Sequence, residues 1–87
     1  AYGGPLMSYL YKPSGVCSRS IRFELNKGVV RNVRFEGGCN GNLQGVARLA
    51  EGRPAAEVAL ALAGIRCDSK TTSCPDQFAR ALREQLP

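Results

Sequence analysis

The sequence predicts an α+β domain in which a three-stranded antiparallel meander is followed by three helices packed on one face. Up to Glu36, apolar and polar residues alternate with a period of two, which is typical of half-buried strands. Beyond Asn40, apolar residues recur at helical spacing between glycine and proline residues that mark helix ends. A chain of 87 residues is long enough for one such domain.

Three strands are predicted in the first half. Tyr9–Tyr11 forms a short first strand that ends at the turn Pro13–Gly15. Ser20–Asn26 and Val29–Glu36 both alternate apolar with polar or charged residues, which predicts two half-buried strands. Lys27–Gly28 separates them as a tight turn, because glycine adopts positive φ without strain.

The hairpin also predicts which residues face each other. If the strands fold back about Gly28, the numbers of paired residues sum to about 56, and those of Cys17 and Cys39 do so. We therefore expect both cysteines just beyond the same end of the sheet. A β-bulge would shift them by a residue or two, but not to the opposite end.

Three helices are predicted in the second half. The first follows the N-cap candidates Asn40–Asn42 and ends at Gly52. The second starts near Pro54, ends at Gly64 and is apolar almost all round, so it is expected to be central. The third runs from near Asp76 to Gln85, with Phe78, Ala79, Leu82 and Leu86 on its buried face. At its start, Ser73 and Asp76 have capping-box spacing and Pro75 fits the first turn.

The net charge of +5 raises the question of an anionic partner. Arg19, Arg22, Arg31 and Arg34 could form a nucleic-acid-binding surface. The basic residues are spread along the chain without interleaved aromatic residues, so nucleic acid is not the favoured partner. The favoured interpretation is a solvated surface that partly balances an anionic thiolate site.

The sequence also predicts where the protein is located and where its domain begins and ends. No apolar run reaches the roughly 20 residues needed to cross a membrane. No secretory signal is evident, so the cytoplasm, where thiols stay reduced, is expected. Met7 resembles a native start, which would make residues 1–6 an added remnant or a disordered end, and residues 7–87 the single domain. Two disulfides remain an open alternative.

Four cysteines without any histidine direct metal or redox chemistry to sulfur. Successive cysteines are separated by 21, 27 and 6 residues, so the fold, not a local loop, must gather them. Cys39 and Cys74 lie at predicted helix starts, where negative charge is favoured. Cys67 and Cys74 bracket a short loop.

The leading hypothesis is one metal site formed by Cys17, Cys39, Cys67 and Cys74. Zn²⁺ is the simplest occupant and an iron–sulfur cluster the alternative, since both accept four cysteines. Two other interpretations stay open. Some cysteines could be ordinary buried residues, or Cys67 and Cys74 could be a dithiol that exchanges with a disulfide of another protein.

Thr72–Asp76 spells TSCPD, and the chain resembles the stand-alone, four-cysteine branch of the TSCPD-domain family. The segments around Gly15–Ser18, Phe35–Gly45 and Gly64–Cys67 carry the rest of the resemblance. The family is similar to the C-terminal region of adenosylcobalamin-dependent ribonucleotide reductases, so the resemblance implies an accessory role beside a larger protein, such as a reductase. Its members often carry a reductase label, but the chain has no room for a reductase barrel.

A weaker resemblance is to the iron–sulfur scaffold fold of the NifU/IscU type. Cys17, Cys39 and Cys74 fall on the three cysteine positions of that fold. The chain departs from it at Arg19, where the scaffold has Asp, and at Ser73, where it has His. Cys67 would supply the missing ligand, and the resemblance then implies a more closed site. Independent catalysis is not expected, because such a site leaves no open position for a substrate.

Overall fold

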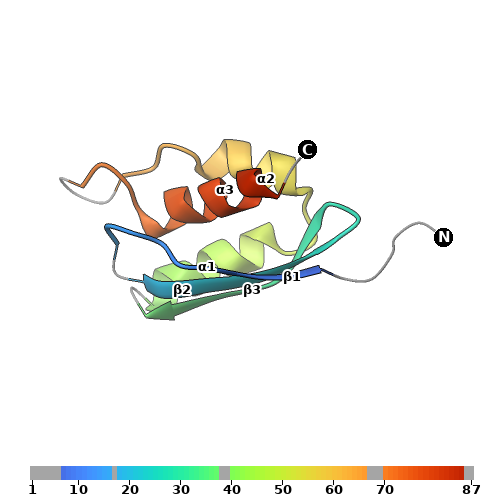
Figure 1. Ribbon diagram of the computed structural model, residues 1–87, viewed down its shortest axis with the longest axis horizontal. Helices are drawn as coiled ribbons and strands as arrows, with labels where there is room; N and C mark the ends of the chain where they lie inside the picture. Colours follow the sequence, from blue (N-terminus) through green and yellow to red (C-terminus); the bar gives the residue numbers. More distant parts are fainter. Residues whose placement is uncertain (1–6, 17, 38–39, 67–69, 86–87) are drawn as a thin grey trace.

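A computed structural model describes residues 7–16, 18–37, 40–66 and 70–85. Its elements are β1 (Met7–Tyr11), β2 (Ser18–Asn26), β3 (Val29–Gly37), α1 (Asn40–Ala50), α2 (Ala55–Leu62) and α3 (Cys74–Glu84). The three strands form one antiparallel sheet in the order β1-β2-β3, and the helices lie on one side of it (Figure 1). The predicted α+β class, meander and three helices are confirmed.

The strand register agrees with the hairpin prediction to within one residue. Ile21 lies opposite Phe35, as expected, whereas Leu25 lies opposite Val30, one residue out of step. At the far end of the pair, Ser18 lies opposite Gly37. The turn residues Lys27 and Gly28 both have positive φ, 56° and 78°, which suits the right-handed twist of the paired strands.

The shift in register comes from a bulge in β3. Between the pairs Arg22↔Arg34 and Glu24↔Arg31, β3 contains one residue more than β2. Asn32 lies at this position with φ 53°, a conformation that asparagine tolerates better than most residues. Its side-chain amide donates to Glu24 (2.6 Å) and its N–H donates to Glu51 (2.8 Å). The bulge therefore connects the sheet to the end of α1.

The core lies between the sheet and the helices, around Phe78 of α3. The ring centroid of Phe78 is 5.6 Å from those of both Phe23 and Phe35, with edge-to-face geometry. Tyr9 stacks on Phe23 at 5.3 Å. Ile21, Phe23, Val30, Phe78 and Leu82 are the largest fully buried side chains. The other face of the sheet, with Arg22 and Arg34, is exposed.

The expectation that the second helix is central is wrong: Ala55, Val58 and Ala59 are buried, but Leu60 is 83% exposed. This eight-residue helix packs mainly on α3, and its apolar character comes largely from alanines, which gain little from burial. Phe78, Ala79 and Leu82 are buried as predicted, and Leu86 is outside the described residues. None of the described helices has the length and apolar character required to span a membrane.

Candidate functional site

Cys74 is the first residue of α3, and its neighbours fix where the helix begins. Ser73 is the N-cap, with extended backbone angles (φ −152°, ψ 169°), and its hydroxyl accepts a hydrogen bond from the N–H of Asp76 at 3.1 Å. Pro75 follows in the first turn, where its missing N–H removes no helical hydrogen bond. The predicted helix start is confirmed, and it places Cys74 in the first turn, at the positive end of the helix dipole.

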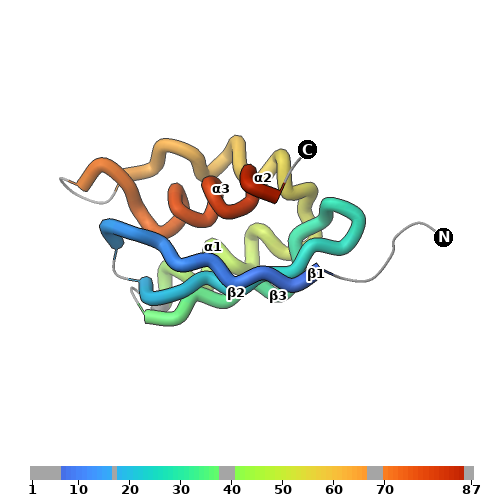
Figure 2. The backbone as a smooth tube through the Cα atoms, in the orientation of Figure 1, coloured from blue at the N-terminus to red at the C-terminus, as the bar shows by residue number. Residues whose placement is uncertain are grey.

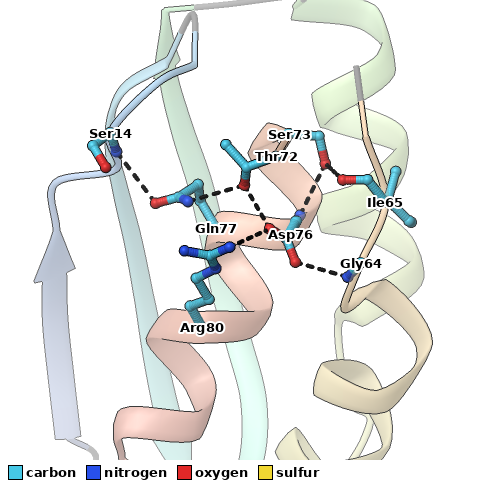
Figure 3. Close-up of polar contacts among 8 residues, drawn as sticks. All are labelled: Ser14, Gly64, Ile65, Thr72, Ser73, Asp76, Gln77 and Arg80. Carbon is cyan, nitrogen blue, oxygen red and sulfur yellow. Dashed lines mark hydrogen bonds and ion pairs between the residues drawn. The ribbon is translucent and has the colours of Figure 1, made fainter. Parts of the chain in front are cut away.

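Asp76 is the centre of a buried polar network (Figure 3). One carboxylate oxygen accepts from the N–H of Gly64 (2.7 Å), and the other accepts from the hydroxyl of Thr72 (2.5 Å) and pairs with Arg80 (3.2 Å). Burial acts to raise the pKa of Asp76, but the donors Thr72 and Gly64 and the charge of Arg80 outweigh it and hold the pKa below its usual value. The carboxylate thus joins the end of α2 to α3.

Gln77 of α3 and the N-cap residue Ser73 anchor two loops to the start of the helix. Gln77, only 2% exposed, accepts from the N–H of Ser14 (3.2 Å) and donates to Thr72 (3.0 Å). The hydroxyl of Ser73 donates to the carbonyl of Ile65 (2.6 Å). Ser14 belongs to the segment that leads to Cys17, and Ile65 to the segment that leads to Cys67. Both segments are therefore held at the start of α3.

The beginning of β2 is connected to the same place. The hydroxyl of Ser18 donates to Sγ of Cys74 at 2.6 Å, and Ser18 is 4% exposed. Because Ser18 faces Gly37, the end of β3 also lies at this edge. Figure 2 shows the end of β1, the end of β3 and the start of α3 gathered at one end of the molecule. We call this the cysteine end.

A pocket of about 200 Å³ opens at the cysteine end beside Cys74. Val16, which immediately precedes Cys17, and Arg66, which immediately precedes Cys67, both line it. Asn42, shortly after Cys39, lines it as well. The rest of the wall is Leu43, Val46, Ile65, Lys70, Ser73 and Pro75. Described neighbours of all three other cysteines thus meet at the pocket that Cys74 lines.

Of the four predicted metal ligands, only Cys74 is among the residues that the structure describes. Cys17, Cys39 and Cys67 are outside them, as are residues 1–6. Over the described ranges, no group of three or more His, Cys, Asp or Glu residues comes together, and Cys74 is a partly exposed free cysteine. The four-cysteine site, the disulfides and the Cys67/Cys74 dithiol all stay predictions.

Two of the four arginines of the predicted nucleic-acid surface are engaged in ion pairs. Arg22 lies 3.5 Å from Glu36, and Arg31 lies 3.4 Å from Glu51. A hydrogen bond from Ser20 and the charge of Arg22 lower the pKa of Glu36. The other two arginines, at positions 19 and 34, are exposed. The positive charge on this surface is therefore partly neutralised, although nucleic-acid binding itself remains untested.

Sequence reasoning missed the network around Asp76. It interpreted Asp76 as the acidic half of a capping box, which would have turned the carboxylate back toward the N-cap backbone. A usable signal was present for one partner, because Asp76 and Arg80 have the i, i+4 spacing at which opposite charges pair on a helix. The partnerships of Ser18 with Cys74 and of Gln77 with Ser14 had no such local signal.

Comparisons with known proteins give one finding. The sequence model of the TSCPD domain matches residues 7–86, which is nearly the whole chain. No curated protein matches the sequence, and no solved structure matches the fold. The NifU/IscU likeness thus stays a prediction.

Proposed function

The chain belongs to the TSCPD-domain family, and we propose that it is a small accessory domain of the cytoplasm that binds one metal ion through Cys17, Cys39, Cys67 and Cys74. Zn²⁺ is the simplest ion for such a set, and an iron–sulfur cluster is the alternative. The domain has no activity of its own in this proposal.

One observation carries the proposal: described neighbours of three cysteines line the same pocket as Cys74. The four residues lie far apart in the sequence, and a shared site requires the fold to bring their segments together. Hydrogen bonds from Gln77 to the Ser14 loop and from Ser73 to Ile65 favour such a gathering.

The chemistry around Cys74 also fits a thiolate site. Metal-bound thiolates commonly accept hydrogen bonds from neighbouring groups, and the hydroxyl of Ser18 is in place to donate one. Four thiolates on a divalent ion carry a net charge of −2, which the nearby side chains of Arg66 and Lys70 would help to balance. When bound, the ion would cross-link distant segments and stabilise the fold.

Metal analysis with an ultraviolet–visible spectrum tests the proposal on protein purified without air. One equivalent of zinc in a colourless sample, or a brown sample containing iron and sulfide, would support it. Stripping the metal should lower the melting temperature, and each single Cys→Ser variant should bind less metal than Ser8→Ala, an exposed control. Metal-free protein with a native circular dichroism spectrum and an unchanged melting temperature would contradict the structural role.

The thiol–disulfide alternative is favoured by the partial exposure of Cys74 at a helix N-terminus. In that case Cys74 attacks a partner's disulfide, and Cys67 resolves the mixed disulfide, leaving the partner reduced and the Cys67–Cys74 pair oxidised. Alkylation at neutral pH distinguishes the two functions. One fast thiol supports exchange, whereas four protected thiols that react only after chelation support a metal.

The partner in this proposal is a larger protein. The family resemblance makes a ribonucleotide reductase the first candidate. Comparing reductase turnover with and without the domain, and size-exclusion chromatography of the mixture, would test this. No co-elution and no change in turnover would remove the reductase as partner while leaving the metal site untouched.

A further inference from the structure

The outer edge of β3, on the side away from β2, is hydrogen-bonded to other segments only in the half near the hairpin. Near the hairpin, Val30 donates to the carbonyl of Arg53 and accepts from the N–H of Gly52, and the N–H of Asn32 donates to Glu51. Along a strand, the main-chain N–H and C=O groups of successive residues point alternately toward and away from the partner strand. Beyond the bulge, this alternation points the groups of Phe35 away from β2 as well. Among the described main-chain groups of other segments, none forms a hydrogen bond with this outer edge beyond Asn32.

A groove runs beside this open stretch, between β3 and α1. It consists of two adjoining pockets of about 240 and about 320 Å³ that share Val33, Arg34, Gln44 and Ala47. Phe35 and Leu43 extend its apolar floor at one end, and Arg48 lines it at the other. We call this the β3–α1 groove. An open strand edge beside an apolar groove suits the addition of an extended peptide as a further strand.

The charges of the groove indicate which peptide it fits. Two acids line it, but Glu36 is held by Ser20 and Arg22, and Glu51 is held by Arg31 and the backbone of Asn32. Arg34 and Arg48 are exposed and form no ion pair with any residue in the described ranges. Within the described residues, the groove is therefore lined by two arginines without an acidic partner, Arg34 at the exposed face of the sheet and Arg48 on α1.

We propose that the β3–α1 groove binds an extended acidic segment of a partner protein, in which apolar and acidic side chains alternate, as a fourth strand on β3. Alternate residues of an added strand face opposite sides, so apolar side chains enter the groove while acidic ones reach Arg34. Arg48, on α1 at one end of the groove, would pair with an acidic residue at the end of the segment. A second copy of this chain is a poor occupant, because two molecules of net charge +5 repel each other. The proposal does not depend on the metal.

The probe is a capped eight-residue peptide of alternating valine and glutamate, titrated into the protein and followed by backbone amide NMR. We expect shifts confined to residues 33–37 and 43–48, and slower hydrogen exchange at Phe35. The matching valine–lysine peptide should not bind. The double variant Arg34→Glu/Arg48→Glu should weaken the acidic peptide by about tenfold or more and begin to bind the basic one. Arg83→Glu, an exposed change of the same charge on α3, should have no effect.

Three results would overturn the proposal. They are no shift at millimolar acidic peptide, equal binding of the acidic and basic peptides, or shifts centred on β1. Tighter binding of an eight-nucleotide oligothymidylate at the same residues would also overturn it, in favour of nucleic acid. Because the two peptides are compared on the unaltered protein, the result does not depend on the variant folding.

Discussion

The two ends of the sheet are joined to the neighbouring segments by different kinds of hydrogen bond. At the hairpin end, three bonds join main-chain groups, Val30 N–H to Arg53 (2.9 Å), Gly52 N–H to Val30 (2.8 Å) and Ala55 N–H to Gly28 (2.7 Å), and the Glu51 side chain adds one to the N–H of Asn32. At the cysteine end they come from side chains. They are made by four polar residues around the start of α3 and by one at the start of β2: Thr72, Ser73, Asp76, Gln77 and Ser18.

The difference predicts where each end tolerates change. Main-chain bonds form with almost any side chain, so the hairpin end should depend mainly on the backbone angles of its glycines. The cysteine end needs particular side chains in buried positions, and Thr72–Asp76, the residues of the family signature, lie there. The signature therefore describes a loop anchor as much as a cysteine.

The largest expected effect comes from Asp76→Ala. It leaves the buried hydroxyl of Thr72 and the N–H of Gly64 without their acceptor, and it removes the ion pair with Arg80. We expect the free energy of unfolding to fall by about 3 kcal/mol, measured by urea denaturation. Glu57→Ala, which breaks the exposed pair with Arg53, is the control and should change it by less than about 0.5 kcal/mol. Equal effects of the two variants would refute the contrast between the ends.

The second-largest effect is expected from acid, which should lower the free energy of unfolding by protonating Asp76. The folded-state pKa of Asp76 lies below its unfolded value of about 4, so the folded state binds fewer protons there. The resulting stability is fully present above that value and is lost as the pH falls through the folded pKa. Urea midpoints measured from pH 6 to pH 2 should show this loss. In Asp76→Asn the profile should be flatter; an unchanged profile would exclude Asp76 as its source.

A smaller effect is expected from Gly52→Ala at the hairpin end. Gly52 has φ 78°, and an added Cβ would meet only the end of Arg31 at 4.0 Å, so the penalty is in the backbone and not in space. We expect a loss of about 1 kcal/mol in the free energy of unfolding. Gly45→Ala, inside α1 and with open space around it, should instead stabilise by about 0.5 to 1 kcal/mol. The two variants differ in sign, which thermal melts can resolve.

The smallest expected effect is that of Ser18→Ala. It removes the hydrogen bond to Sγ of Cys74 without leaving a strong buried acceptor unpaired. The free energy of unfolding should fall by about 0.5 to 1 kcal/mol. Ser8→Ala, which loses an exposed 3.4 Å contact with Glu24, should leave it unchanged. A loss from Ser18→Ala as large as that from Asp76→Ala would show that Ser18 has a larger part in closing this end.

Local patterns predicted most of the fold, because the features concerned are themselves local. Alternation in Ser20–Asn26, the turn at Lys27–Gly28 and the N-cap at Ser73 depend on neighbouring residues alone. The bulge at Asn32 was not located, since a single extra residue hardly disturbs alternation. Burial of the second helix was overestimated, because a run of alanine and leucine does not reveal which face meets α3.

The candidate site was predicted only in part. The arrangement of the hairpin located the end of the sheet at which Ser18 and Gly37 meet. The contacts that build the site join residues such as Ser14 and Gln77, or Ser18 and Cys74, which are more than fifty positions apart. Side-chain hydrogen bonds over such separations depend on how α3 packs on the sheet. No spacing of residues in the sequence predicts that packing.

The tight turn at Lys27–Gly28 has a consequence for how the chain folds. Its twist matches the strands and its contacts are close in sequence, so the β2–β3 hairpin is expected in the folding nucleus. The bonds of Gln77 and Ser18 span most of the chain and should form after the rate-limiting barrier. Gln77→Ala should then speed unfolding and leave the refolding rate nearly unchanged, whereas Val30→Ala should slow refolding. A newly made domain would thus form its β2–β3 hairpin before the segments of the cysteine end come together.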